Sequence, residues 1–73
     1  MTGNEWTQHF GERLREVRLL RGKTQEEVRS GTGIASKAIS RYENGRLIPT
    51  LQNTIKLLDF YDIKLEDLLK KMS

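Results

Sequence analysis

The chain has 73 residues, no cysteine and a formal net charge of +3, and its length allows one small domain, which we expect to span residues 1–73. A domain of this size buries only about 60% of the surface that its unfolded chain exposes, and without cysteines neither disulfides nor a thiolate metal site can reinforce it. No apolar stretch approaches the roughly 20 residues that cross a bilayer, so composition excludes a disulfide-rich scaffold and a membrane-spanning protein.

The N-terminal part of the chain predicts an amphipathic helix between Asn4 and Gly22. Its apolar residues are spaced by four, four and three positions, which places them on one face of a helix. These residues are Trp6, Phe10, Leu14 and Val17. Asn4 is a residue type that caps helix N-termini, and Gly22 can adopt the positive φ at which helices often end.

A second, short helix is predicted after Thr24. Thr24 is a suitable N-cap, and Glu27 three residues later completes a capping box. The segment 30–33, Ser-Gly-Thr-Gly, is expected to break this helix within about two turns. Gly33 is where the following tight turn needs a left-handed backbone conformation.

Three further helices are predicted in the rest of the chain. The third runs from about Ala35 to Asn44, the fourth is capped by Thr50 and interrupted by Asp62, and a short fifth follows Ile63. The residues expected to face inward are Ile34, Ile39 and Tyr42 around the third helix and Leu51, Ile55 and Leu58 in the fourth, while the fifth helix is formed by Leu65, Leu68 and Leu69. Since no period-two alternation occurs, the fold class is all-α with five helices.

A polar, positively charged face distinguishes the third helix. Residues 11–46 carry nine Lys or Arg against five Asp or Glu, whereas residues 47–73 carry four of each, so the excess lies where a polyanion could be met. Arginine and lysine donate to guanine O6 and N7, serine donates or accepts, and asparagine reads adenine or holds a phosphate. An ordinary solvated helix surface is the alternative interpretation. The outward side chains are Ser36, Lys37, Ser40, Arg41 and Asn44.

Several short motifs match one known family when taken together. They are Gly11-Glu12-Arg13-Leu14-Arg15, Arg18, Thr24-Gln25-Glu26-Glu27-Val28, Gly33-Ile34, Ile39-Ser40-Arg41-Tyr42-Glu43-Asn44-Gly45, Pro49-Thr50-Leu51 and Ile63-Lys64-Leu65-Glu66-Asp67-Leu68-Leu69. With these motifs, residues 11–69 resemble the Cro/lambda-repressor-like, or Xre, family of helix-turn-helix DNA-binding domains. The resemblance implies a compact five-helix fold in which the second and third helices form the helix-turn-helix and the third enters the major groove.

The resemblance also implies roles for individual residues. Gln25, at the N-terminus of the second helix, would bind a phosphate with the help of the helix dipole. Asn44 and Arg46 would present backbone amides and a cation to a second phosphate, and Arg18 and Glu43 would form an ion pair between the first and third helices. The residues that would face base edges are Ser36, Lys37, Ser40 and Arg41.

Three positions depart from the family pattern. Lys23 replaces a common apolar residue, and we expect it to contact a phosphate. Arg29 replaces an alanine where two helices approach closely, so its stem would have to extend to the surface and open the packing slightly. Ala35 replaces a capping serine or threonine, at a cost of about 1 kcal/mol unless Ser36 substitutes as the cap.

We expect a cytoplasmic, non-enzymatic transcriptional regulator that binds double-stranded operator DNA as a homodimer. Repression by blocking polymerase is the leading hypothesis, and activation stays open. Neither a catalytic set nor a cofactor motif is found, His9 has no second ligand for a metal, and the N-terminus lacks a secretory signal.

A different class of function remains as the alternative: a protein-interaction module, such as an antitoxin or antirepressor-like partner, with secondary DNA binding. Its protein partner would contact the C-terminal helix. Several large apolar side chains pack in the core or form a self-association surface, and the sequence leaves both open; they are Trp6, Phe10, Leu19, Leu20, Leu69 and Met72.

Overall fold

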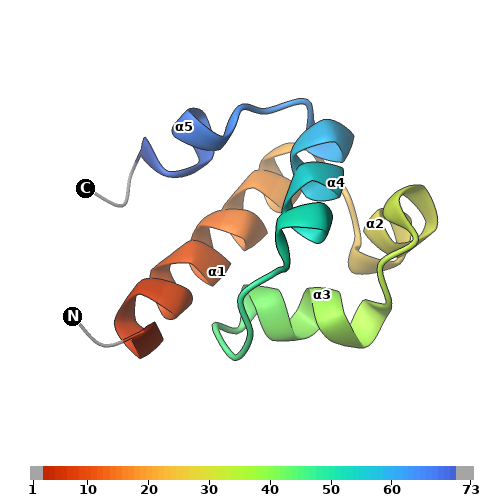
Figure 1. The fold of residues 1–73 in the computed structure, drawn as a ribbon. Helices are drawn as coiled ribbons and strands as arrows, with labels where there is room; N and C mark the ends of the chain where they lie inside the picture. Colours follow the sequence, from red (N-terminus) through yellow and green to blue (C-terminus); the bar gives the residue numbers. More distant parts are fainter. Residues whose placement is uncertain (1–2, 71–73) are drawn as a thin grey trace.

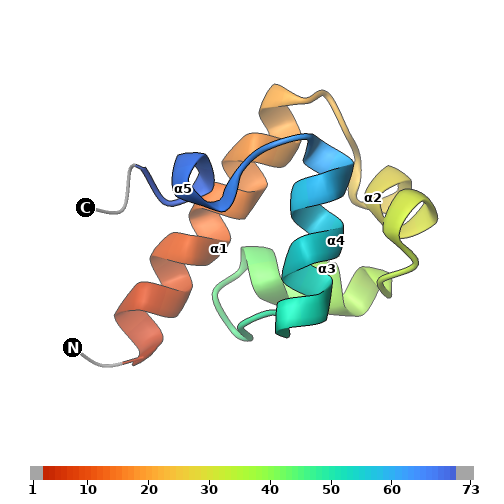
Figure 2. The same cartoon turned by 45° about the horizontal axis from the view of Figure 1, so that its top comes forward.

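Five helices make up the part of the chain that the structure, a computed structural model, describes, which is residues 3–70. In chain order they are α1 (Gly3–Leu20), α2 (Gln25–Thr32), α3 (Ser36–Glu43), α4 (Leu51–Tyr61) and α5 (Leu65–Leu68). α3 packs against α1 and α2, α4 lies against α2, and α5 turns back beside α1 (Figures 1 and 2). The predicted five-helix, all-α class is confirmed, and residues 3–70 contain no strand.

The helix boundaries follow local capping signals, with two differences from expectation. α1 begins at Gly3, so Asn4 lies inside the helix and is not its N-cap. α2 continues through Ser30 and Gly31 to Thr32, and only Gly33, in the left-handed conformation (φ 77°), ends it. The continuation is stabilised because the Thr32 hydroxyl donates to the Val28 carbonyl at 2.7 Å and accepts from the Ile34 amide at 3.1 Å.

Side chains cap α2 and α4 but not α3. Thr24 accepts from the Glu27 amide at 3.1 Å while the Glu27 carboxylate accepts from the Thr24 amide at 2.9 Å, which is the predicted capping box. Thr50 caps α4 by accepting from the Asn53 amide at 3.1 Å. Ala35 precedes α3 without a side-chain hydrogen bond, and Ser36 does not take over the cap. The first amides of α3 are therefore left without a side-chain acceptor at the N-cap position.

The core lies where α1, α3 and α4 meet. Its members within residues 3–70 are Phe10, Leu14, Val17, Val28, Ile34, Ile39, Tyr42, Leu57, Tyr61 and Leu68. The inward faces predicted for α1 and α3 are buried, except for Trp6, which is 37% exposed and stacks on Phe10.

The inward face predicted for α4 is wrong. Leu51 and Ile55 are 78% and 57% exposed, Leu58 is half-buried, and α4 buries Leu57 and Tyr61 instead. Apolar residues occupy two sides of this helix, so periodicity alone does not select the side that α2 and α1 cover. In α5, Leu68 is buried and Leu65 is exposed.

Two glycines allow helices to approach closely. A Cβ atom on Gly11 would lie 2.2 Å from the Tyr42 carbonyl oxygen, so α1 and α3 touch through backbone. A Cβ atom on Gly31 would lie 2.1 Å from the ring of Phe60, which brings α2 against α4. These contacts fix how α3 is held on α1 and how α2 is held on α4. No helix within residues 3–70 has the length and apolar character needed to cross a membrane.

Candidate nucleic-acid interface

The polar face of α3 is turned to solvent. Lys37 and Arg41 are exposed and Ser36 and Ser40 partly exposed, while Ile39 lies on the buried side. Lys37 and Arg41 are four residues apart and therefore neighbours on one side of the helix. Within residues 3–70, neither side chain forms a hydrogen bond or an ion pair. α3 thus presents two unpaired cations and two hydroxyls on one face.

The corner after α3 differs in part from expectation. The backbone amides of Asn44, Gly45 and Arg46 all donate to carbonyls of the last turn of α3, at 3.0, 3.2 and 2.9 Å. These amides are thus already bonded within the chain, and the phosphate contact expected at this corner stays a prediction, for which the side chains are the free donors. Arg46 is exposed, and the Asn44 amide nitrogen donates to the Ser40 hydroxyl at 3.3 Å.

The two basic departures on either side of the capping box are both at the surface. Lys23 is exposed, and its backbone carbonyl accepts from Arg18 Nη1 at 2.9 Å. Arg29 is also exposed and pairs with Glu26 on the same helix. The guanidinium of Arg29 therefore reaches the surface, as expected.

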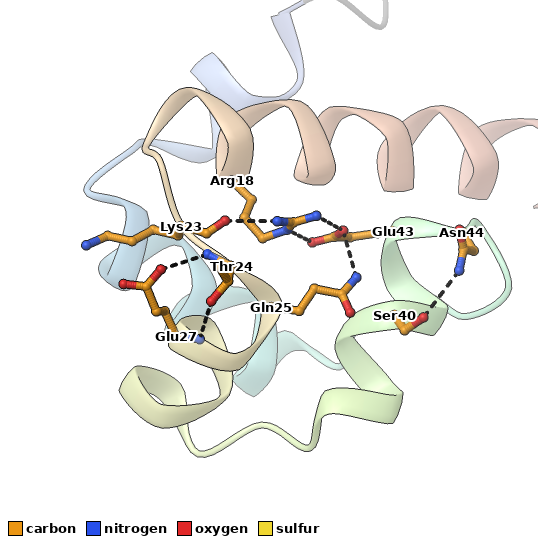
Figure 3. A network of polar contacts seen from close by, with 8 residues as sticks. All are labelled: Arg18, Lys23, Thr24, Gln25, Glu27, Ser40, Glu43 and Asn44. Atoms are coloured by element: carbon orange, nitrogen blue, oxygen red, sulfur yellow. Dashed lines mark hydrogen bonds and ion pairs between the residues drawn. The ribbon is translucent and has the colours of Figure 1, made fainter.

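A buried ion pair joins α1 to the end of α3, as the resemblance implies. Arg18 Nε and Nη2 donate to the two carboxylate oxygens of Glu43 at 2.7 and 3.0 Å. The hydrogen bond to Glu43 raises the pKa of Arg18 above its ordinary value, although burial opposes this. Gln25 joins the pair, because its Nε2 donates to the same carboxylate at 3.1 Å (Figure 3). The sequence did not predict this third member.

Two further arginines, Arg13 of α1 and Arg21 directly after it, stabilise the fold, and the sequence had not predicted either role. Arg13 donates to the carbonyls of Leu68 and Asp67 at 2.8 and 3.0 Å. Arg21 donates to the carbonyl of Tyr61 at 2.8 Å. Both guanidinium groups therefore satisfy carbonyls that the ends of α5 and α4 leave without intrahelical partners. A signal existed in the sequence, since each short helix ends without a basic residue of its own.

The cations of the middle segment therefore fall into two groups. Arg13, Arg18, Arg21 and Arg29 are bound to other groups of the domain. Five others are exposed, and their side chains form no hydrogen bond or ion pair within residues 3–70, although the charge of Lys23 helps to lower the pKa of Glu27: Arg15, Lys23, Lys37, Arg41 and Arg46. The second group is available to an anionic ligand. In the same range no cluster of three or more His, Asp or Glu residues is arranged to hold a metal ion.

Of the apolar residues considered for self-association, some are buried in the structure and others are exposed. Phe10 is buried and Leu69 half-buried, whereas Leu19 and Leu20 at the end of α1 are exposed. Met72 lies outside the described residues. The most exposed large apolar side chain within residues 3–70 is Leu51 on α4.

Comparison with known proteins agrees with this arrangement. The family model described as "Helix-turn-helix" matches residues 14–68. The "Cryptic phage CTXphi transcriptional repressor RstR" of Vibrio cholerae is 34% identical over 59 residues, which are 81% of this chain and 53% of RstR. An uncharacterized HTH-type transcriptional regulator of Methanocaldococcus jannaschii, MJ0272, is 30% identical over 77% of this chain and 85% of its own length. The chain thus spans about half the length of RstR but most of the archaeal relative.

A solved structure is similar to the whole arrangement of helices. The restriction-modification controller protein C.AhdI from Aeromonas hydrophila superposes with a TM-score of 0.80 and 32% sequence identity. The match covers 85% of this chain and 94% of C.AhdI. From the matching family model, the relatives and the shared fold it follows that this chain belongs to the Cro/lambda-repressor-like family of helix-turn-helix domains.

Proposed function

We propose that the domain binds double-stranded DNA sequence-specifically through α3 and regulates transcription, with repression as its effect. The observation that carries the proposal is the exposed face of α3, where Lys37 and Arg41 are unpaired. The one carboxylate on this helix, Glu43, is buried and neutralised by Arg18. A face of this kind offers donors to base edges and no negative charge to repel phosphates.

The side chains divide by position into base-reading and phosphate-binding groups. Those on the exposed face of α3 would contact base edges in the major groove; they are Ser36, Lys37, Ser40 and Arg41. Those at the N-terminus of α2 and the corner after α3 would contact phosphates; they are Gln25, Lys23, Asn44 and Arg46. Phosphate contacts fix the register on the duplex, and base contacts carry the specificity.

Selection of bound duplexes from a random pool, followed by two substitutions, tests this division. Arg41→Ala should cost roughly 1–3 kcal/mol on the selected site and flatten discrimination at one base position. Arg46→Ala should weaken binding to all sequences alike and reduce the slope of log K against log salt by about one. Lys56→Ala, an equal loss of charge on an exposed residue of α4, is the control and should change little.

Two results would count against the proposal. An affinity that does not change with salt concentration would contradict an electrostatic contact with the phosphate backbone. If the Arg41→Ala variant kept the sequence preference of the parent, Arg41 would not read bases. If Lys37→Ala also kept it, α3 would not be the element that reads the DNA sequence.

We propose further that the domain acts as a homodimer joined through the outer sides of α4 and α5. Leu51, Ile55 and Leu65 are exposed there, and one domain reads too few base pairs for strong specificity. The adjoining surface carries both signs of charge, including Asp59 and Lys64. A surface of mixed charge can pair with a second copy of itself across a two-fold axis. In such an interface an acidic residue of each copy can face a basic residue of the other, so every contact between opposite charges occurs twice.

Sedimentation analysis of two variants tests the dimer. Ile55→Asp should yield monomers and abolish cooperative binding to paired half-sites. Leu20→Asp, on an apolar residue of α1 that is 70% exposed, should leave the dimer intact. The opposite pattern would place self-association on α1. A monomeric parent protein would favour the other class of function, in which the exposed apolar residues of α4 contact a different protein.

A further inference from the structure

One carboxylate lies where three helices meet. Glu43 is the last residue of α3, and its side chain is 3% exposed. One carboxylate oxygen accepts from Arg18 Nε of α1 at 2.7 Å. The other accepts from Arg18 Nη2 at 3.0 Å and from Gln25 Nε2 of α2 at 3.1 Å (Figure 3). Every element of the helix-turn-helix is thus bonded to the same group.

We propose that Glu43 is a positioning residue for the phosphate contact of Gln25, an inference that rests on the proposed function. A free glutamine side chain has three rotatable bonds and samples many rotamers, and ordering it has an entropic cost. The hydrogen bond to Glu43 fixes the amide of Gln25 before DNA arrives. An amide nitrogen carries two hydrogens, so one is held by Glu43 and the other is available to a phosphate oxygen.

Arg18 makes this arrangement compatible with an anionic ligand. An unpaired carboxylate beside a phosphate site would repel the phosphate. Because the carboxylate is buried, water and salt would screen this repulsion only weakly. The two hydrogen bonds from Arg18, whose guanidinium is always charged, neutralise Glu43. Arg18 also binds the carbonyl of Lys23, just before α2, at 2.9 Å. The ion pair therefore holds both the start of α2 and the side chain that projects from it.

A double-mutant cycle in DNA affinity distinguishes positioning from a structural role. Glu43→Gln leaves too few acceptor positions for both Arg18 and Gln25, and should weaken binding to the selected duplex roughly threefold to tenfold. In a Gln25→Ala background the same substitution should have no further effect, because the residue that it positions is gone. All variants are assayed at a temperature where urea unfolding shows them to be folded.

The matched control is Arg21→Gln, which removes a guanidinium bonded to the Tyr61 carbonyl without touching Gln25. It should destabilise the fold, and the loss of one positive charge should change the affinity of the folded protein by the same small factor in both backgrounds. Equal losses of affinity for Glu43→Gln with and without Gln25 would overturn the inference, because they indicate a structural effect alone.

Two further readouts separate this inference from the proposed function. If Gln25→Ala binds as the parent does while Arg41→Ala and Arg46→Ala are weakened, the inference fails and the DNA-binding function stands. If Glu43→Gln does not fold, nuclear magnetic resonance of the Gln25 side-chain amide in the parent decides. One hydrogen should already be protected without DNA and the other should shift when duplex is added, and two unshifted hydrogens would overturn the inference.

Discussion

The close contact between α1 and α3 at Gly11 predicts that a larger residue at this position lowers the stability of the fold. A Cβ atom at this position would lie 2.2 Å from the Tyr42 carbonyl oxygen, 2.9 Å from the Gly45 amide nitrogen and 3.0 Å from the Glu43 carbonyl oxygen. All three atoms belong to the backbone and cannot rotate away, so the two helices must separate by roughly 1 Å. Overpacking of this kind costs about 1–3 kcal/mol, and we place Gly11→Ala at the upper end because the obstruction is rigid.

The opposing effect is the helix propensity of alanine, which favours the substitution by about 1 kcal/mol inside a helix. The net prediction for Gly11→Ala is therefore a loss of about 2 kcal/mol. A 73-residue domain is stable by only roughly 4–11 kcal/mol. The loss should lower the melting temperature by roughly 10 °C. In urea the midpoint should fall while the m-value is unchanged, since the surface exposed on unfolding is the same.

Ser30→Ala is the matched control, because Ser30 is an exposed residue of α2. It should raise stability by a few tenths of a kcal/mol through propensity alone. If Gly11→Ala were also as stable as the parent or more stable, the close approach of α1 to α3 would be refuted.

Three other substitutions test separate features. Ala35→Ser should add the missing N-cap of α3 and raise the free energy of unfolding by about 1 kcal/mol, measured by thermal unfolding. Arg13→Ala should free the last carbonyls of α5 and speed hydrogen exchange at the Leu68 amide, with little change at Val28. Burial, with a smaller contribution from Glu43, raises the pKa of Tyr61 from 10.0 to about 12. The folded protein therefore holds this proton more tightly than the unfolded chain, so its stability should fall as the pH rises from 10 to 12, and Tyr61→Phe should remove that part of the decline.

Local signals in the sequence predicted where most helices begin and end. Thr24 with Glu27, Thr50 and Gly33 act through hydrogen bonds or dihedral preferences within a few residues, and the structure places each at the expected helix end. The side of α4 that is buried was not predictable in this way. Apolar residues line two sides of α4, and the choice depends on contacts with α2, where Gly31 leaves room for the ring of Phe60.

The exposed face of α3 follows from the sequence because helical spacing separates its residues into two sets. With Ile39 and Tyr42 buried, Lys37 and Arg41 must point away from the core. The bond from Gln25 to Glu43 was not predictable, since it depends on how α2 crosses α3. Only the tertiary arrangement shows that the residue expected to bind a phosphate is already held by an internal partner.

The net charge of the domain does not distinguish arginines that pair with carboxylates from arginines that bind neutral backbone carbonyls. Arg18 and Arg29 are paired with carboxylates, so each contributes little to the field felt by a distant anion. Arg13 and Arg21 bind neutral backbone carbonyls at helix ends, yet Arg13 also meets Glu16 on α1 whereas Arg21 has no carboxylate partner within residues 3–70. Arg21 therefore keeps its full charge although its guanidinium is held in place. Under the proposed function, Arg21 can therefore contribute only to the long-range attraction of DNA, whereas exposed, unpaired cations such as Lys37 and Arg41 can also contact the duplex directly.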